Sequence, residues 1–321
     1  MREPEMNRRY FFFGCFAGAL ACSRSAPKSK PRVSIIRTKS YSSDLHDLFR
    51  RILLEHRVAI EGKRVLLKPN LVEFSAQNHI NTHALFVAAA SQAFRSLGAK
   101  SVRIAEGPGH RRMTWDLASA AGYFDAVPAF EKNFTDLNLD NVSRIRLGDP
   151  FSRLSELYLP HTALDCDLLV SLPKMKTHHW TGATLSMKNL FGLVPGAIYG
   201  WPKNVLHWAG IDECVADLHY LFPRQFCLVD AIEAMEGNGP ILGNSITPGL
   251  IIAGTHPPSV DATCCRIMQI DPAKIKYLSL IAGRSRWSVD SIQQIGESIR
   301  SVETRFALIP DLEGLRLDGA A

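Results

Sequence analysis

The segment Asp167–His178, DLLVSLPKMKTH, begins with an apolar run and becomes polar after Pro173. The apolar part is short and dense, which predicts a buried β-strand ending at Leu172. Lys174, Lys176 and His178 then alternate along the sequence. If the chain stays extended past the proline, their three side chains point to the same side.

Hydroxyl groups and a third lysine follow directly. Thr181, Thr184 and Lys188 stand three and four residues apart, so a helix beginning near Thr181 would place them on one face. Thr181 could also cap that helix. Ammonium, hydroxyl and backbone N–H groups aimed at one point form an anion site at a helix N-terminus. The alternative is a solvated loop whose lysines only provide solubility.

The rest of the chain alternates between strand and helix patterns. Strands are predicted at 33–37, 64–68, 101–105, 225–229 and 249–253, and helices at 45–56, 82–97, 115–121, 212–221 and 258–268. Thr82 is predicted to cap the second helix. Such alternation indicates a mainly parallel sheet with helices on both faces. Alternating patches at 142–147 and 154–159 predict a small antiparallel insertion. We therefore expect a single α/β domain over 32–321.

Charged residues stand at the ends of four predicted strands: Lys68, Glu106, Lys174 and Asp230. Ligands of open α/β sheets bind beyond the carboxyl ends of the strands, so these groups predict a site there. The candidate catalytic residues are Lys174, Lys176, His178, Glu106 and Asp230. The candidate ligand-binding residues are Lys68, Asn70, Thr181, Thr184, Lys188, Asn189 and Asn238.

A second acidic group extends from Asp230 through Glu233 to Glu236. If it begins a helical turn, Asp230 and Glu233 share a face and can hold a divalent metal or divide acid and base roles. The alternative is an acidic loop facing water. Asp261, on an otherwise apolar helical stripe, is a third candidate metal ligand; we expect it at an exposed helix start, where the dipole favours an acid, rather than buried with a partner.

The amino terminus is read separately. Arg8 and Arg9 precede a short apolar run and then small residues up to Cys22, the pattern of a twin-arginine export signal over 1–22. Cys22 fits a lipidated residue, and 23–31 a flexible tether. The expected partner is the twin-arginine export machinery, with membrane contact only through the signal or the lipid. The expected location is the periplasm, or the outer side of the inner membrane as a lipoprotein.

Composition restricts the remaining classes. The 321 residues are 46% hydrophobic with a formal charge of +6, and no long Lys/Arg run occurs, which argues against nucleic acid as a partner. Five cysteines follow the signal without a CxxC pair, so no iron–sulfur cysteine motif is present. Cys264 and Cys265 are expected to be buried free thiols.

Together these motifs resemble the bacterial and archaeal family catalogued as domain of unknown function 362. The resemblance runs in order from about residue 63 to Leu280 and rests on several motifs. They are KPNL at 68–71, TH at 82–83, EGPG at 106–109, PKMKTH at 173–178, TGAT at 181–184, MKNLFG at 187–192, DAI at 230–232 and MEGNGP at 235–240. The closing stretch 253–262 also fits, although the family usually has an acid where His256 stands.

The resemblance implies little about function. Some longer members carry a ferredoxin-like cysteine segment that this chain lacks, so it implies no iron–sulfur cluster here, and twin-arginine signals occur on similar proteins. We expect an exported enzyme that acts on a small carboxylate or phosphate through clustered lysines and carboxylates. The alternative is a non-catalytic binding or carrier protein for an anionic cofactor or metal. The cofactor is left open, with a divalent metal as one candidate.

Overall fold

The computed structural model describes residues 30–42, 44–110 and 112–317. The predicted export signal, Cys22 and most of the tether lie outside these residues. Within them, eleven strands form the main sheet. Its central path runs through β13 (Gln293–Gly296), β1 (Arg32–Arg37), β12 (Leu250–Gly254), β10 (Gln225–Glu236), β7 (Leu168–Leu172), β2 (Arg64–Pro69), β3 (Ser101–Glu106) and β4 (Phe134–Asp136).

The sheet is mixed and mostly parallel. β10, β7, β2, β3 and β4 pair in parallel, whereas β12 is antiparallel to both β1 and β10. Three short strands leave the central path: β8 (Lys174–His178), β9 (Gly182–Thr184) and β11 (Asn244–Ile246). β5 (Val142–Arg146) and β6 (Glu156–Pro160) form a separate antiparallel pair. The predicted fold class, including the antiparallel insertion, is confirmed.

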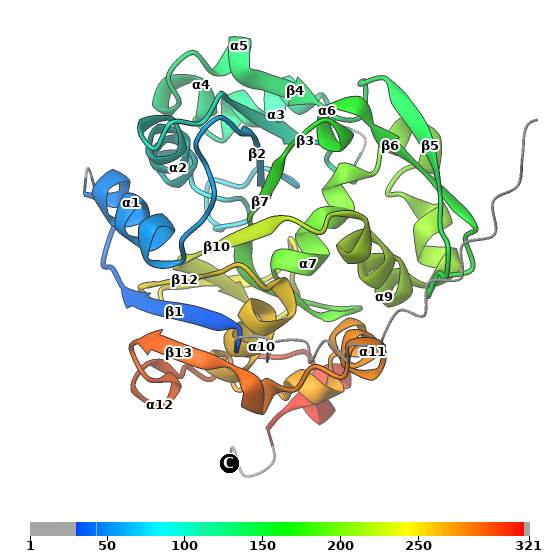
Figure 1. Cartoon of the computed structure of the whole chain (residues 1–321). Helices are drawn as coiled ribbons and strands as arrows, with labels where there is room; N and C mark the ends of the chain where they lie inside the picture. The colour runs from blue at the N-terminus through cyan, green and yellow to red at the C-terminus, as the bar shows by residue number, and fades with distance from the viewer. Residues whose placement is uncertain (1–29, 43, 111, 318–321) are drawn as a thin grey trace, which may run out of the picture.

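Helices cover both faces because the buried strands are apolar on both sides. Leu66 packs with one core cluster, while its neighbours Val65 and Leu67 pack with the other. One side carries α1 (Leu45–Glu55), α2 (Ala84–Ser96), α3 (Thr114–Ala120), α4 (Tyr123–Ala126) and α5 (Phe130–Asn133). The other carries α7 (Ser186–Asn189), α9 (Asn204–Leu221), α10 (Pro257–Ile267) and α11 (Lys276–Ser285), as Figure 1 shows.

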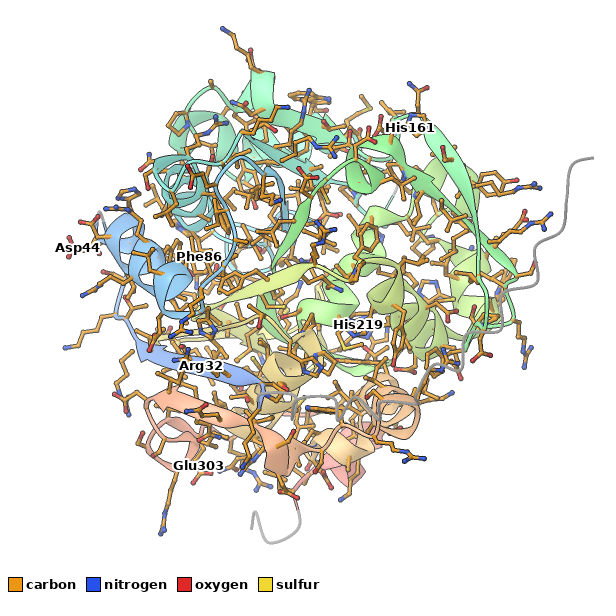
Figure 2. All side chains as sticks on the ribbon, in the orientation of Figure 1. Arg32, Asp44, Phe86, His161, His219 and Glu303 are labelled. Carbon is orange, nitrogen blue, oxygen red and sulfur yellow. The ribbon has the colours of Figure 1, made fainter. Side chains whose placement is uncertain are left out.

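Shorter helical turns complete the chain. They are α6 (His161–Leu164), η1 (Leu190–Leu193), α8 (Gly196–Tyr199), η2 (Pro272–Lys274), η3 (Val289–Ser291), α12 (Ile299–Val302) and η4 (Pro310–Leu315). Figure 2 shows Phe86 inside the molecule and Glu303 at its periphery, in agreement with their burial. Among the described residues no helix combines the length and apolar character needed to cross a bilayer.

The predicted helix start at Thr181 is wrong. Residues 182–184 form β9, which turns back antiparallel on β8, and α7 begins only at Ser186. Gly182 makes this turn with φ +77°, and a Cβ there would lie 2.6 Å from the Ile275 side chain. A close-packed turn therefore replaces the first turn of the expected helix.

The expected helical turn after Asp230 is also wrong. β10 continues to Glu236, so Asp230 and Glu233 are three residues apart on a strand and point to opposite sides. α2 is capped by His83, whose Nδ1 accepts a hydrogen bond from the Leu85 N–H, and not by Thr82. The Thr82 hydroxyl donates instead to the Leu172 carbonyl at 2.6 Å.

Candidate functional site

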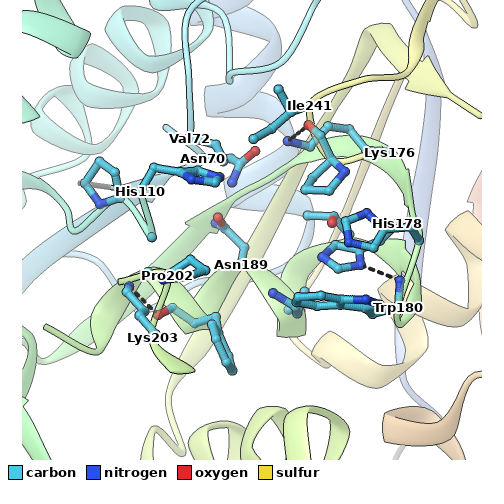
Figure 3. A pocket seen from close by; sticks show the side chains of 18 of the residues that line it. Asn70, Val72, His110, Lys176, His178, Trp180, Asn189, Pro202, Lys203 and Ile241 are labelled. Atoms are coloured by element: carbon cyan, nitrogen blue, oxygen red, sulfur yellow. Dashed lines mark hydrogen bonds between the residues drawn. The ribbon is translucent and has the colours of Figure 1, made fainter. Parts of the chain in front are cut away.

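A cavity of about 760 Å³ opens at the carboxyl ends of β2, β3 and β8. The loops that follow β2 and β3 form one wall, and β8, β9 and α7 form another. Figure 3 shows Asn70, Lys176, His178 and Lys203 around a common space, with Asn189 between them. The strand-end rule applied to the sequence therefore located the cavity.

Four lysines line this cavity: Lys68, Lys176, Lys188 and Lys203. Three of them, all except Lys188, are no more than 1% exposed. Lysine is rarely buried unless it is paired, yet Glu106 is the one carboxylate among the described residues that forms an ion pair with any of the four. The described cavity lining therefore holds more lysines than carboxylates, which are Glu106 and Asp311.

Lys68 and Glu106 form a buried ion pair. Lys68 Nζ also donates to the Pro69 carbonyl and to Asn189 Oδ1, and the Glu106 carboxylate accepts from the N–H groups of Leu71 and Gly107. Every oxygen of Glu106 is thus occupied by a structural donor. Glu106 lines the cavity but serves to fix its shape.

The main chain passes close over this pair at Gly192. A Cβ at this position would overlap both the Glu106 carboxylate and the Lys68 ammonium. Only glycine allows this approach, which explains the glycine that follows Phe191 in the sequence.

Lys176 and Lys203 are held by backbone carbonyls. Lys176 Nζ donates to Ile80 and Pro240, and Lys203 Nζ donates to Gly107 at 2.7 Å and Phe191 at 2.8 Å. Burial lowers the pKa of Lys203 to about 7. Burial and then the charges of Lys174 and Lys188 hold the pKa of Lys176 well below its usual range.

Lys188 differs from the other three. Its Nζ lies 4.2 Å from the centroid of the Phe191 ring, and among the described residues it donates no hydrogen bond. Burial lowers its pKa to about 8. Two further lining groups, the Thr184 hydroxyl and the Asn70 amide oxygen, are buried without a hydrogen-bond partner in the part of the chain that the structure describes. Both groups can hydrogen-bond a molecule in the cavity, the hydroxyl as a donor or acceptor and the amide oxygen as an acceptor.

The histidines present both a donor and an acceptor. His178 Nδ1 accepts from the N–H groups of Trp180 and Thr181, so the proton of the neutral ring is on Nε2. His207 Nδ1 faces the Lys203 carbonyl at 3.0 Å and therefore carries the proton, which leaves Nε2 as a base. Burial lowers the pKa of both rings below the usual range, so both are neutral near pH 7.

Asp261 holds α7 in place. Its carboxylate accepts from the N–H groups of Ser186 at 2.8 Å and Met187 at 2.9 Å. The expectation of an exposed Asp261 is wrong: the side chain is fully buried, and backbone donors replace water. Asp261 therefore positions the short helix that carries Lys188 and Asn189.

Lys174 and Asp230 lie outside the cavity lining. They form a 2.7 Å ion pair, and Tyr41 bonds to both. Lys174 also donates to the Glu233 carbonyl, and Asp230 accepts from the His83 N–H. The two candidates do lie together, but outside the cavity, and the charge of each is paired within the protein. This cluster joins the segment before α1 to β8 and β10.

The three candidate metal ligands do not meet. Glu233 Oε2 lies 3.0 Å from His79 Nδ1, Glu236 accepts from the Ala307 N–H, and Asp261 holds α7. Among residues 30–42, 44–110 and 112–317 no three His, Cys, Asp or Glu side chains gather as a metal group.

The remaining candidate residues divide between wall and support. Asn70, Thr184, Lys188, Asn189 and Asn238 line the cavity with Lys68. Thr181 does not, because its hydroxyl donates to the Ala183 carbonyl. Cys264 and Cys265 are buried free thiols as expected.

Sequence reasoning missed Lys203, whereas His207 is a residue type that can bind a ligand or carry a proton, although a single histidine is more often structural. Lys203 precedes α9 with φ +71°, far from any strand end, and no periodic pattern marks it. The Pro202-Lys203-Asn204 turn at a helix start was the one available signal.

The model of the family described as domain of unknown function (DUF362) matches residues 65–266. A thylakoid-associated protein of Synechocystis sp. is 30% identical over 261 residues, which cover 77% of each chain.

Two solved structures are similar in part. The lactate racemase apoprotein of Thermoanaerobacterium thermosaccharolyticum aligns with a TM-score of 0.45 and 16% identity, over 75% of this chain and 57% of that one. A Thermotoga maritima protein aligns with a TM-score of 0.41 and 12% identity, over 71% of this chain and 59% of that one. This chain thus spans less than two thirds of either structure's length. The family match and the Synechocystis relative show that this chain belongs to the family described as domain of unknown function DUF362.

Proposed function

We propose that this protein is an enzyme that binds a small carboxylate or phosphate in the cavity and moves a proton to or from it. The proposal rests on lysine and hydroxyl groups of the cavity lining that have no hydrogen-bond acceptor among the described residues. Lys188 and Thr184 present donors that nothing among the described residues accepts, and the described lining holds four lysines against two carboxylates, Glu106 and Asp311. A bound anion would satisfy these donors.

The two neutral histidines would act as the acid and base groups of the reaction. His207 Nε2 can accept a proton and His178 Nε2–H can donate a hydrogen bond to a developing negative charge. Lys176 and Lys203, already oriented by carbonyls, would attract the anion in their protonated forms, which the bound anion itself favours.

The first experiment is thermal unfolding of the purified protein with phosphate, acetate, lactate and succinate. At one hundred times Kd an anion adds about 2.7 kcal/mol of stability, which is readily measured. The Lys188→Ala variant should lose this gain, while the exposed Lys132→Ala should retain it. Proton transfer is then tested by NMR in D2O, where His207→Gln should abolish any exchange of ligand C–H. Absence of stabilisation by every anion would contradict the proposal.

A specific observation favours a second function, a carrier that holds an anionic cofactor without turnover. Both predicted acid–base carboxylates, Glu106 and Asp230, are occupied by structural donors. A carrier binds the anion with the same dependence on Lys188 but shows no exchange in D2O. The NMR experiment therefore separates the two functions.

Export is proposed from the sequence alone. Arg8 and Arg9 with the apolar run that follows support twin-arginine transport, and Cys22 supports lipid attachment. Fractionation of cells tests both points: replacing the two arginines by lysine should retain the protein inside the cell, and Cys22→Ala should release it from the membrane. Unchanged distribution of both variants would contradict export and lipidation.

A further inference from the structure

We propose that Lys188 forms a Schiff base with the carbonyl carbon of a small anion, such as a 2-oxo carboxylate or an aldehyde phosphate. This inference rests on the proposed function, because it names the chemical class of ligand for the same cavity. It follows from the hydrogen bonds of the four lining lysines.

Imine formation removes N–H donors from a lysine. Lys68, Lys176 and Lys203 each donate to two or more acceptors, so a Schiff base there would leave carbonyl or carboxylate oxygens without a donor. Lys188 Nζ donates no hydrogen bond within the described part of the chain, and its contact is the face of Phe191. Lys188 alone of the four can become an imine without breaking the cavity wall.

The surroundings suit the carbonyl-bearing anion as well. A bound carboxylate or phosphate would favour the protonated forms of Lys176 and Lys203, and the Thr184 hydroxyl and the Asn70 amide oxygen lack partners among the described residues. α7 is fixed by Asp261, so the Lys188 backbone is held in place. The lowered pKa of Lys188, due to burial, provides the unprotonated amine that the attack requires.

The step balances without an oxidant or reductant. The Nζ lone pair forms a bond to the carbonyl carbon, and the π electrons move to oxygen, which takes up a proton. The nitrogen then expels this oxygen as water, and both hydrogens of the water are supplied overall by the amine. The His178 Nε2–H and the His207 Nε2 line the same cavity and can donate and accept the protons in transit.

The test is reductive trapping of the full chain with pyruvate and cyanoborohydride, followed by intact mass and peptide mapping. We expect one adduct per chain, equal in mass to pyruvate less one water plus two hydrogens, on Lys188. Lys188→Arg keeps the charge but cannot form the imine, and should reduce trapping at least tenfold. The exposed Lys132→Arg controls for surface reaction and should trap like the wild type.

Binding of lactate, which has no carbonyl carbon open to attack, is measured in parallel by calorimetry. Lactate binding without an adduct from pyruvate or glyceraldehyde 3-phosphate overturns the Schiff base and leaves the proposed function standing. An adduct spread over surface lysines overturns it equally. Failure of both lactate and inorganic phosphate to bind, together with no adduct, overturns both proposals.

Discussion

Lys174 Nζ lies 2.7 Å from Asp230 Oδ2, and neither residue lines the cavity, although Lys176 and His178 of the same strand do. Tyr41 bridges the two charges, donating to Asp230 Oδ1 and accepting from Lys174. The Lys174–Asp230 pair thus supports the fold, whereas the other buried pair, Lys68 and Glu106, lines the cavity.

Lys174→Ala should destabilise the protein by about 3–5 kcal/mol, because it leaves the Asp230 charge buried without its partner. Urea unfolding measures this loss. Anion affinity at a temperature where the variant is folded should change less than twofold. A folded variant that has lost anion binding would show that the pair belongs to the site.

Gly192→Ala should open or distort the cavity floor, since the new methyl group overlaps Lys68 and Glu106. Overpacking of this kind costs about 1–3 kcal/mol or more. Chemical denaturation and anion titration should both show the defect. Gly148→Ala, where no atom lies within 4 Å of the added Cβ, is the matched control and should behave as wild type.

Asp261→Ala should leave the N–H groups of Ser186 and Met187 without an acceptor and loosen α7. Each unsatisfied buried donor costs about 1–3 kcal/mol, so a loss of about 2–6 kcal/mol is expected. Anion affinity should fall as well, because Lys188 is carried by this helix. Retention of full affinity in a destabilised protein would exclude Asp261 as a positioning residue.

A rise in pH should increase the folding stability of the ligand-free protein and decrease its affinity for anions. The pKa values of Lys203, about 7, and Lys188, about 8, lie below the ordinary 10.5 because of burial. The unfolded chain therefore binds more protons between about pH 7 and 10.5, and these two groups make the ligand-free protein more stable as pH rises through that window.

Anion binding should weaken over the same rise, because it favours the charged lysines. Affinity should fall by up to about tenfold per pH unit for each proton taken up above pH 8. Calorimetry in buffers of different ionisation enthalpy should detect proton uptake on binding near pH 7.5. Binding that releases protons, or that strengthens toward pH 9, would refute the role of these ammonium groups.

The sequence predicted the parts of this account that depend on local pattern. Alternation of strands and helices gave the fold class, and the extended Lys174–His178 segment is strand β8. Strand ends located the cavity through Lys68 and Glu106. What it could not predict depends on tertiary packing: Gly182 turns β9 back onto β8, and Lys174 bonds to Tyr41, which is far away in the sequence. Lys203 is brought in by a loop whose position no periodicity encodes.

The most direct test of the central claim is calorimetric titration of the wild type and Lys188→Ala with the best anion of the panel. Loss of one charge-assisted contact of about 1.5–3 kcal/mol predicts an affinity lower by about 10- to 150-fold, with unfolding free energy equal to or above that of the wild type. An affinity within twofold of the wild type, in a variant that unfolds normally, would contradict the account.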